Sequence, residues 1–398
     1  MLGLSNAMTS GSHHEQQYSL LLDGNSDYLE IGDNLDFGTN DFAISLWFKQ
    51  DAAATSSELL FSKYQGGNNK VNIVLNSSNK IQANVEGSSN NIFSAAGGTA
   101  LEGDGGYWIH VVLTCDRDGD TKLYINGTTS TYGTSASSLN STQNLDNTGS
   151  IYIGARSNND LYFPGKIDEV AVWQAADLSD FDSNAVQAIR NGGDPFDLNY
   201  DRGDYHHSAS LTGYWRMFNG PFDDLQNGIV HDAHNPGYGA DLAVDGGFDT
   251  DVAASTTGTY WITSADWVVD NGVATISGTT NNRDLQEATT HLVQTKTYQV
   301  NLDVTFSAGT GKIMISSTNF DSNGGSYVTI DSSSGSGNYT VYFRAGSVSA
   351  GERFVVRAKN TSGATFTATV DNIVIKQLNG YPGITNATAT FSTSTPDD

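Results

Sequence analysis

The chain has 398 residues, and its 44 Asp and Glu residues against 19 Lys and Arg residues give a formal net charge of −25. A charge of this sign and size repels phosphate backbones, which argues against nucleic acid as a partner. The single cysteine, Cys115, cannot form an internal disulfide. No apolar run approaches the roughly 18–20 residues of a membrane-spanning helix, so we expect no membrane insertion.

The first block of the chain, residues 17–193, alternates between apolar and polar residues as half-buried strands do. Cys115 shares one face of such a strand with Ile109 and Val111, so we expect it to be a core residue. One helix is predicted, capped by Ser179 and ended by Gly192. Predicted strands lie at residues 42–49, 71–75, 81–85, 108–115, 122–125, 151–155 and 167–173.

A second block, residues 241–379, also alternates strictly and has Gly-Ser-rich turns. Its predicted strands lie at residues 298–306, 312–316, 327–331, 339–344, 353–358 and 366–376. Three segments fall outside the two blocks: arms at residues 1–16 and 380–398, and a connection at residues 194–240. We therefore predict an all-β protein with two antiparallel β-sandwich domains, one short helix and extended terminal arms.

The first block resembles the laminin-G-like or concanavalin-A-like jelly-roll family along nearly its whole length. The matching stretches occur in family order. They include Tyr28–Ile31, Phe42–Lys49, Trp108–Thr114, Leu123–Gly127, Ile151–Gly154 and Gly165–Val170. The resemblance implies a jelly-roll fold for this domain.

The second block resembles the family-4/9-type carbohydrate-binding modules, which also implies a jelly roll. It opens with Asp245–Asp249, continues through Trp261 and Trp267, and closes with the strand Val370–Lys376. The whole arrangement, with a Met-Leu-Gly-Leu start and the segment Gly213–Met217 between the domains, is similar to structural proteins of tailed bacteriophages, especially marine phages.

The phage resemblance implies a component of the virion, with other virion proteins as partners and a homo-oligomer, such as a trimer, as its assembly. Residues 1–17 contain no basic residue before a hydrophobic stretch, so they do not read as a secretory signal. A phage protein reaches the outside by host lysis and needs no such signal. We therefore expect the chain at the virion surface, on a tail appendage or on the capsid exterior.

The sequence does not predict an enzyme. Glucanases of the concanavalin-A-like fold resemble one another in carrying two glutamates on one strand, a few residues apart. In this chain the two glutamates closest in sequence are Glu15 and Glu30. Asp168 and Glu169 are adjacent, so in a strand they point to opposite faces.

Calcium is the expected cofactor, in a structural role. In a jelly roll, acids near the first and last strands can converge, which pairs Asp23 with Asp168 and Asp249 with Asp371. Both pairs match positions where the two resembled families often hold a structural Ca²⁺, and carboxylate oxygens suit that ion. The alternative is that these aspartates only make turns.

Carbohydrate binding is expected in the second domain. Trp261, Trp267 and Tyr260 precede its first long strand, where tryptophans of similar modules line the sugar-binding face. Asn282 and Arg283 form a nearby polar loop that could supply hydrogen bonds. The alternative for Trp267 is a core position, because Val268 and Val269 continue it as a strand.

These observations together predict a non-catalytic virion surface protein. It would attach to the particle through its terminal arms by strand addition and display jelly rolls for weak, multivalent binding of host glycans. One alternative is a purely structural decoration protein without glycan binding. Another is the binding region of a secreted polysaccharide-degrading enzyme.

Overall fold

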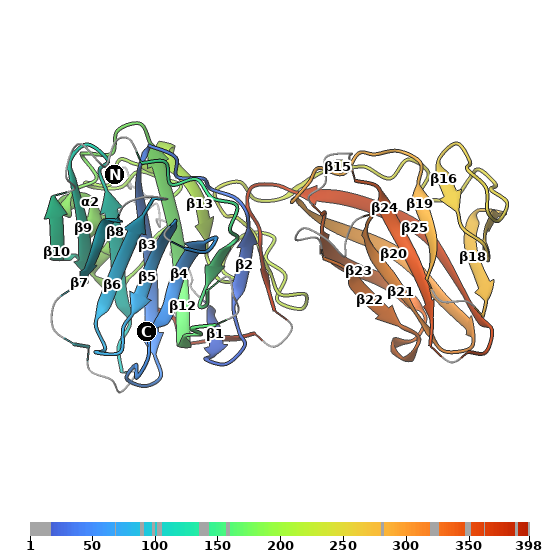
Figure 1. Ribbon diagram of the computed structural model, residues 1–398, viewed down its shortest axis with the longest axis horizontal. Helices are drawn as coiled ribbons and strands as arrows, with labels where there is room; N and C mark the ends of the chain where they lie inside the picture. The colour runs from blue at the N-terminus through green and yellow to red at the C-terminus, as the bar shows by residue number, and fades with distance from the viewer. Residues whose placement is uncertain are drawn as a thin grey trace, which may run out of the picture. The chain divides into compact units, whose positions relative to one another are not determined.

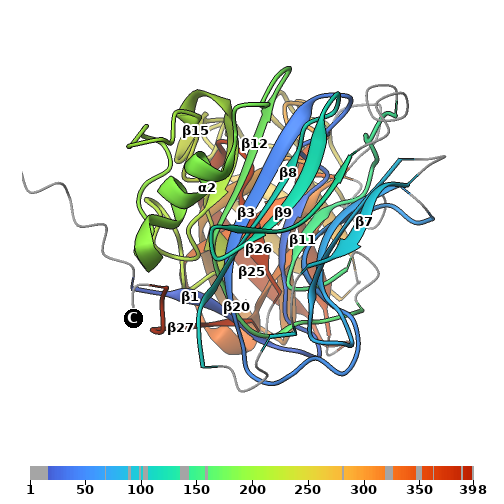
Figure 2. The same cartoon turned by 90° about the vertical axis from the view of Figure 1, so that its left-hand side faces the viewer.

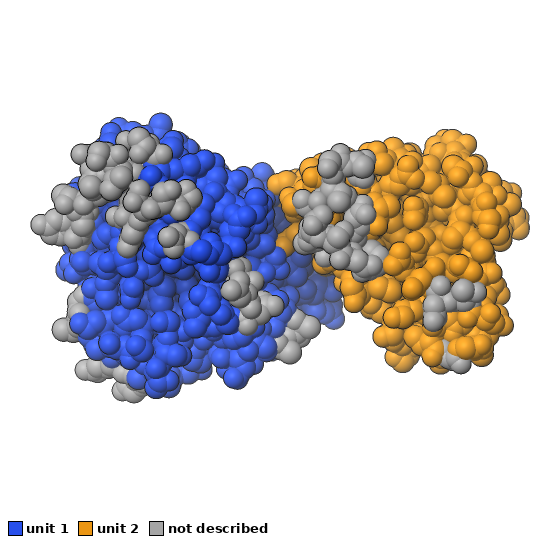
Figure 3. Space-filling model, viewed as in Figure 1, with its two compact units in different colours: residues 1–236, 380–398 blue, residues 237–379 orange. Residues whose placement is uncertain are grey.

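The computed structural model forms two compact units: unit 1, residues 1–236 with 380–398, and unit 2, residues 237–379 (Figure 3). It describes residues 17–67, 69–87, 91–97, 100–101, 106–134, 143–156, 160–279, 282–318, 326–346, 352–361, 363–386 and 389–396. The predicted N-terminal arm, residues 1–16, lies outside the described residues. Among the described residues, no helix is long and apolar enough to span a membrane.

Unit 1 is a sandwich of two antiparallel sheets of eight strands each (Figure 1). Sheet A has the order β10 (Thr128–Thr134), β9 (Asp120–Ile125), β8 (Ile109–Cys115), β3 (Asp41–Gln50), β12 (Pro164–Ala175), β1 (Ser19–Asp23) and β27 (Thr390–Ser392), with β13 (Leu211–Trp215) also paired to β12. Sheet B has the order β14 (Ile229–Val230), β26 (Gly383–Thr385), β2 (Leu29–Gly32), β11 (Ile151–Ile153), β4 (Glu58–Tyr64), β5 (Lys70–Leu75), β6 (Ile81–Glu86) and β7 (Asn91–Ala96).

The main core of unit 1 lies between these sheets, and the alternation of each strand supplies it. Val71 and Ile73 of β5 face Val111 and Leu113 of β8 within one apolar cluster. Cys115 belongs to the same cluster and is buried, as predicted. Burial raises the pKa of its thiol to about 12, so this cysteine is a packing residue rather than a nucleophile.

The outer face of sheet A is covered by the helix α2 (Ser183–Arg190) and by the connection that follows it (Figure 2). Ala185, Val186 and Ile189 are buried on the helix, in a second apolar cluster that includes Trp173 of β12. The helix begins later than predicted, because the carboxylate of Asp182, rather than Ser179, accepts the bonds from the first helical N–H groups.

The C-terminal segment is not the arm that the sequence predicted, because it completes both sheets of unit 1. β26 lies between β14 and β2, and β27 pairs with β1. Side chains fasten it further: Asn386 Oδ1 accepts from Tyr28 N at 3.2 Å, and Ser19 Oγ donates to Ser394 O at 2.7 Å. Residues 194–236 likewise contribute β13 and β14 rather than a structureless connection.

Unit 2 is a second antiparallel sandwich, and it begins four residues before the predicted boundary because β15 pairs with β25. Sheet C has the order β17 (Trp267–Asp270), β18 (Val273–Gly278), β25 (Phe366–Leu378), β20 (Thr297–Ala308) and β23 (Gly337–Arg344), with β15 (Tyr238–Asp241) on β25. Sheet D has the order β16 (Trp261–Thr263), β19 (Arg283–Glu287), β24 (Phe354–Asn360), β21 (Gly311–Ser317) and β22 (Val328–Asp331). Short 3₁₀ turns are Asn191–Gly193, Ser208–Ser210 and Ser332–Ser334.

Candidate functional site

A row of polar side chains crosses the outer face of sheet B. Because successive strand residues point to opposite faces, a residue between two core residues must face outward. Asn72 lies between the core residues Val71 and Ile73, and Asn84 lies between Ala83 and Val85. Ser62, Ser94 and Tyr152 occupy equivalent outward positions on β4, β7 and β11.

The strand register places these residues side by side. Tyr152 pairs with Ser62, and Ser62 pairs with Asn72. Asn72 then pairs with Asn84, and Asn84 pairs with Ser94. We call these five residues the polar row. Neighbouring strands lie about 4.8 Å apart, so the row extends for about 19 Å at right angles to the strands.

The middle of the polar row has buried polar atoms without partners. Ser62 is fully buried and Asn72 is 6% exposed. Within the described part of the chain, neither Ser62 Oγ nor Asn72 Oδ1 has a hydrogen-bond partner. Leaving a buried polar atom unpaired costs about 1–3 kcal/mol. Such atoms in a native fold require an explanation, and a buried water molecule is one.

The exposed end of the row is hydrogen-bonded. Asn84 Oδ1 accepts from Ser94 Oγ at 2.8 Å and from Gln82 Nε2 at 3.0 Å. Asn84 is half-buried and Ser94 is exposed, so both side chains are within reach of a molecule in solution.

Aromatic rings and an internal ion pair flank the row. Tyr28 packs edge-on against Tyr152, with ring centroids 5.2 Å apart. Burial raises the pKa of Tyr28, so its phenol stays neutral. Lys70 and Glu86 pair across β5 and β6, each two residues from an asparagine of the row and therefore on the same face. Their side chains form an ion pair at 3.0 Å, so the two charges balance each other. The row is thus an uncharged array of amides and hydroxyls beside an aromatic pair.

Unit 2 shows a contrasting polar face on sheet C, where the side chains bond to one another. Gln299 Nε2 donates to Tyr342 Oη at 2.6 Å, and Thr340 Oγ1 donates to Asn301 Oδ1 at 2.6 Å. These groups satisfy each other. In this they differ from Ser62 Oγ and Asn72 Oδ1, which have no partner among the described residues.

The predicted sugar-stacking tryptophans of unit 2 are core residues. Trp261 and Trp267 are fully buried in the apolar cluster between sheets C and D. Their indole N–H groups are bonded inside the fold, to Asp245 O and to Arg283 O, each at 2.9 Å. A ring without exposed surface cannot stack on a sugar, so the prediction was wrong for Trp261, and Trp267 follows the core alternative.

The remaining predicted sugar contacts have mixed positions. Tyr260 is half-buried and packs against the core of unit 2. Arg283 Nε is paired with Asp266 at 3.1 Å. Asn282 is exposed, with a positive φ of 58°. Without the tryptophan rings these residues make no sugar platform.

The structure does not bring Asp23 and Asp168 together. Asp23 pairs with Pro164 across β1 and β12, which leaves Asp168 about 13 Å farther along the strand. Asp23 is exposed, and its Oδ1 accepts from three backbone N–H groups of the following turn. Asp168 is fully buried and accepts from Glu169 N. The predicted calcium pair of the first domain was therefore wrong.

Asp249 and Asp371 lie on segments that do meet. Gly246 O accepts from Ile373 N at 2.9 Å, which holds the loop before Asp249 against the strand that carries Asp371. A Cβ on Gly246 would lie 1.9 Å from Ile373 O, so only glycine fits this approach. Within the described ranges there is no group of three or more His, Cys, Asp or Glu residues that could hold a metal.

Sequence reasoning missed the polar row. The alternation Val71–Asn72–Ile73 and Ala83–Asn84–Val85 did place the asparagines outward. What it could not supply is the register, because the pairing across β11, β4, β5, β6 and β7 depends on bulges such as the one between Leu59 and Phe61.

Residues 23–179, which include the whole polar row, match the model of the concanavalin A-like lectin/glucanases superfamily. This confirms the predicted resemblance of the first domain. No curated protein sequence matches the chain.

Several solved structures are similar. The SAP-like pentraxin of Limulus polyphemus is 14% identical, with 44% of this chain and 82% of that chain covered and a TM-score of 0.34. Domain 4 of AbnA, an extracellular arabinanase from Geobacillus stearothermophilus solved with arabinotriose, is 21% identical, with 42% and 74% covered and a TM-score of 0.32. The CBM40 of the Ruminococcus gnavus IT-sialidase is 12% identical, with 40% and 91% covered and a TM-score of 0.32.

Proposed function

We propose that the chain is a non-catalytic carbohydrate-binding protein and that unit 1 binds a neutral glycan chain along the polar row. The observation that carries this proposal is the row of amides and hydroxyls that the strand register aligns and that ends in the accessible side chains of Asn84 and Ser94. Sugar hydroxyls both donate and accept hydrogen bonds, so they can bond to the amide and hydroxyl groups at this end of the row. The superfamily match of residues 23–179 supports the same assignment.

The geometry of the row suits an extended chain. The strand spacing of about 4.8 Å is close to the length of one sugar unit, so successive units can meet successive strands. At one end of the row the half-buried ring of Tyr28 packs on the buried ring of Tyr152. The row carries no charge, and a chain with net charge −25 repels anionic polymers. A neutral polysaccharide therefore fits best.

A double variant, Asn72→Ala with Asn84→Ala, tests the proposal. Two lost hydrogen bonds at about 1 kcal/mol each should weaken binding of a neutral polysaccharide roughly thirtyfold. Asn40→Ala is the matched control, since Asn40 is an exposed turn residue away from the row. Binding would be measured by titration calorimetry across a panel of neutral polysaccharides. Equal affinity of the double variant and the wild type for every polymer that binds would refute the site.

We also propose that this binding takes place on the surface of a tailed-phage virion, as part of a tail fibre or capsid fibre. The order of the sequence segments and the acidic composition support this. Since the C-terminal segment is folded into unit 1, attachment through an arm falls to residues 1–16. Repetition of unit 1 in a homo-oligomer, such as a trimer, would turn weak sites into avid ones. Deleting residues 1–16 should then abolish incorporation into particles without reducing glycan binding.

A second candidate function is the binding region of a polysaccharide-degrading enzyme. The superfamily match favours it to the same degree, because the superfamily includes glucanases as well as lectins. Failure to find the chain in purified particles would favour this function over the virion role.

Of the two predicted calcium pairs, we propose a structural site only at Asp249 and Asp371. The close approach of Gly246 to Ile373 supports it, because backbone carbonyls there could complete a shell of hard oxygen ligands. Added Ca²⁺ should raise the melting temperature of unit 2 and EDTA should lower it. An Asp371→Asn variant should lose this response, whereas Asp23→Asn should keep it.

A further inference from the structure

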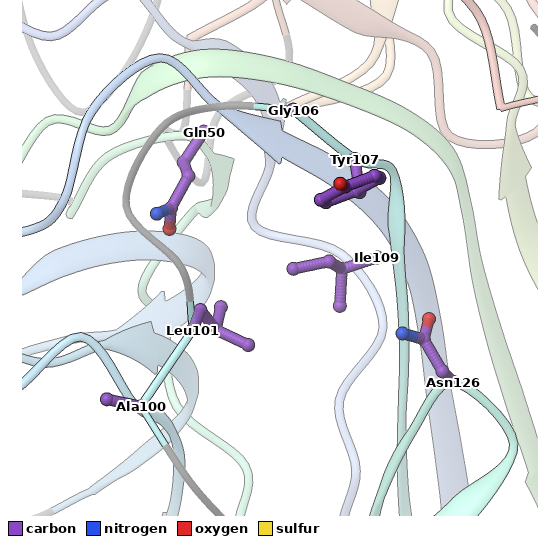
Figure 4. A pocket seen from close by; sticks show the side chains of 7 residues that line it. All are labelled: Gln50, Ala100, Leu101, Gly106, Tyr107, Ile109 and Asn126. Carbon is purple, nitrogen blue, oxygen red and sulfur yellow. The ribbon is translucent and has the colours of Figure 1, made fainter.

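A pocket of about 270 Å³ opens at one end of the unit 1 sandwich (Figure 4). It is formed where strands end rather than on a sheet face. Gln50 is the last residue of β3, Ile109 is the first of β8, and Asn126 follows β9. Among the described residues, the lining is Gln50, Ala100, Leu101, Gly106, Tyr107, Ile109 and Asn126. The polar row lies in mid-strand on sheet B, so the two sites are separate.

One side of the pocket is apolar and fixed in place. Leu101 and Ile109 form this side (Figure 4). Leu101 is held through its backbone: its N–H donates to Asn79 O at 2.8 Å, and its carbonyl accepts from Asn79 Nδ2 at 2.6 Å. Tyr107 stands at the rim with 71% of its surface exposed. An apolar wall with an exposed ring suits the apolar face of a sugar.

Two carboxamides complete the lining. Asn126 Oδ1 accepts from His110 N at 3.0 Å, which fixes the orientation of the amide. Its Nδ2 is turned toward the pocket (Figure 4), and no described residue accepts a hydrogen bond from it. Gln50 is only 2% exposed, and its side chain enters from another side (Figure 4). Asn126 is exposed, so hydroxyl groups of a ligand can bond to its amide.

We infer that this pocket binds a single neutral monosaccharide unit, such as the non-reducing end of a glycan, with its ring on Tyr107. The volume lies just below the range of typical ligand pockets, which suits one ring rather than a chain. None of the seven described lining residues is charged, so they offer no cation to pair with the carboxylate of a uronic or sialic acid. This inference rests on the proposed glycan binding by unit 1, and it adds a second site that takes chain ends.

Exposure alone does not make a tyrosine a sugar-binding residue. Tyr200 of the same unit is 70% exposed and is not among the described residues that line this pocket. What distinguishes Tyr107 is the apolar wall and the two amides beside it. Tyr200 is for this reason the matched control.

The test is titration of the full chain with glucose, galactose, mannose and glucuronate, followed by saturation-transfer NMR. At least one neutral hexose should bind in the millimolar range, and glucuronate should bind at least tenfold more weakly. Tyr107→Ala should weaken hexose binding about tenfold, whereas Tyr200→Ala should leave it unchanged. Thermal unfolding of both variants checks that they fold as the wild type does.

The row variant Asn72→Ala with Asn84→Ala separates this inference from the proposed function. It should lose affinity for the polysaccharide and keep affinity for the hexose. Tyr107→Ala should lose affinity for the hexose and keep affinity for internal segments of the polysaccharide. Polysaccharide binding without any hexose binding would overturn the pocket alone. Equal effects of Tyr107→Ala and Tyr200→Ala, or glucuronate binding as tight as that of the hexoses, would also overturn it.

Discussion

Ser62 and Ser45 are two buried serines of unit 1 with opposite surroundings. Ser45 is 2% exposed, and its hydroxyl bonds to His110 Nε2 at 2.8 Å. Ser62 is fully buried, and its hydroxyl has no partner among the described residues. An unpaired hydroxyl inside a protein lowers stability, whereas a paired one contributes to it. The Ser62 hydroxyl is therefore expected to lower the stability of unit 1.

Replacing each serine by alanine tests this contrast. Ser62→Ala should raise the free energy of unfolding by about 1 kcal/mol, because it removes an unpaired buried hydroxyl. Ser45→Ala should lower the free energy of unfolding by about 1 kcal/mol, because it leaves His110 unpaired. Urea denaturation measures both. If Ser62→Ala destabilises unit 1 as much as Ser45→Ala does, the Ser62 hydroxyl has a structural role.

Trp261 has the structural role that the sequence did not assign to it. Trp261→Ala should destabilise unit 2 by about 3–5 kcal/mol, because it leaves a large cavity in the core and removes the hydrogen-bond donor to the carbonyl of Asp245. Val268→Ala, at a 38% exposed position nearby in the chain, should change stability by less than about 1 kcal/mol. Calorimetry of the unit 2 transition measures both. Normal stability of Trp261→Ala would show that the ring is not packed as the structure has it.

The sequence predicted whether a residue is buried better than it predicted which residues meet across strands and loops. Alternation alone placed Cys115 in the core and Asn72 outside it, because both follow from the two-residue period of a strand. It misplaced Trp261 because a short strand, Trp261–Thr263, has too few residues to show which face is buried. Strand register and loop closure are long-range properties. For this reason the polar row and the pocket could be found only in the folded chain.

At the scale of elements, the C-terminal segment decides whether unit 1 is complete. Its Thr- and Ser-rich sequence lacks the hydrophobic alternation that marks a strand, so it reads as an arm. The structure uses its backbone rather than its side chains: β26 fills a position between β14 and β2, and β27 covers the edge of β1. Backbone pairing of this kind leaves little trace in sequence.

Ending the chain at Asn379 should therefore destabilise unit 1 and leave unit 2 unchanged. The truncation uncovers the edges of β1 and β2 and takes away β26, which pairs with β14 in sheet B. Uncovered edges also promote aggregation. Calorimetry should show the unit 1 transition at a clearly lower temperature, and light scattering should show association. Removing only residues 397–398 is the control. Two unchanged transitions would contradict the assigned pairing.

At the scale of the whole molecule, the strongly shifted histidines and carboxyl groups belong to unit 1. Burial lowers the pKa of His110 to about 3, with Arg190 adding to the effect, and lowers the pKa of His231 to about 4. Burial also raises the pKa of Glu58 and of Asp223 to about 7. The histidines favour the fold at neutral pH, and the two carboxyl groups favour it in acid. The pH dependence of unit 1 is the balance of these opposing contributions.

A His110→Gln variant isolates the histidine contribution. The folded-state pKa of His110 lies below its unfolded value of about 6.5, so the unfolded chain takes up the proton first as the pH falls. The stability that neutral His110 provides is complete above pH 6.5 and is lost progressively between about pH 6.5 and pH 3. Wild-type unit 1 should thus lose a few kcal/mol more than His110→Gln between pH 7 and pH 4. Urea unfolding at both pH values measures this difference. Parallel losses in the two proteins would show that His110 is protonated or solvated in the folded state.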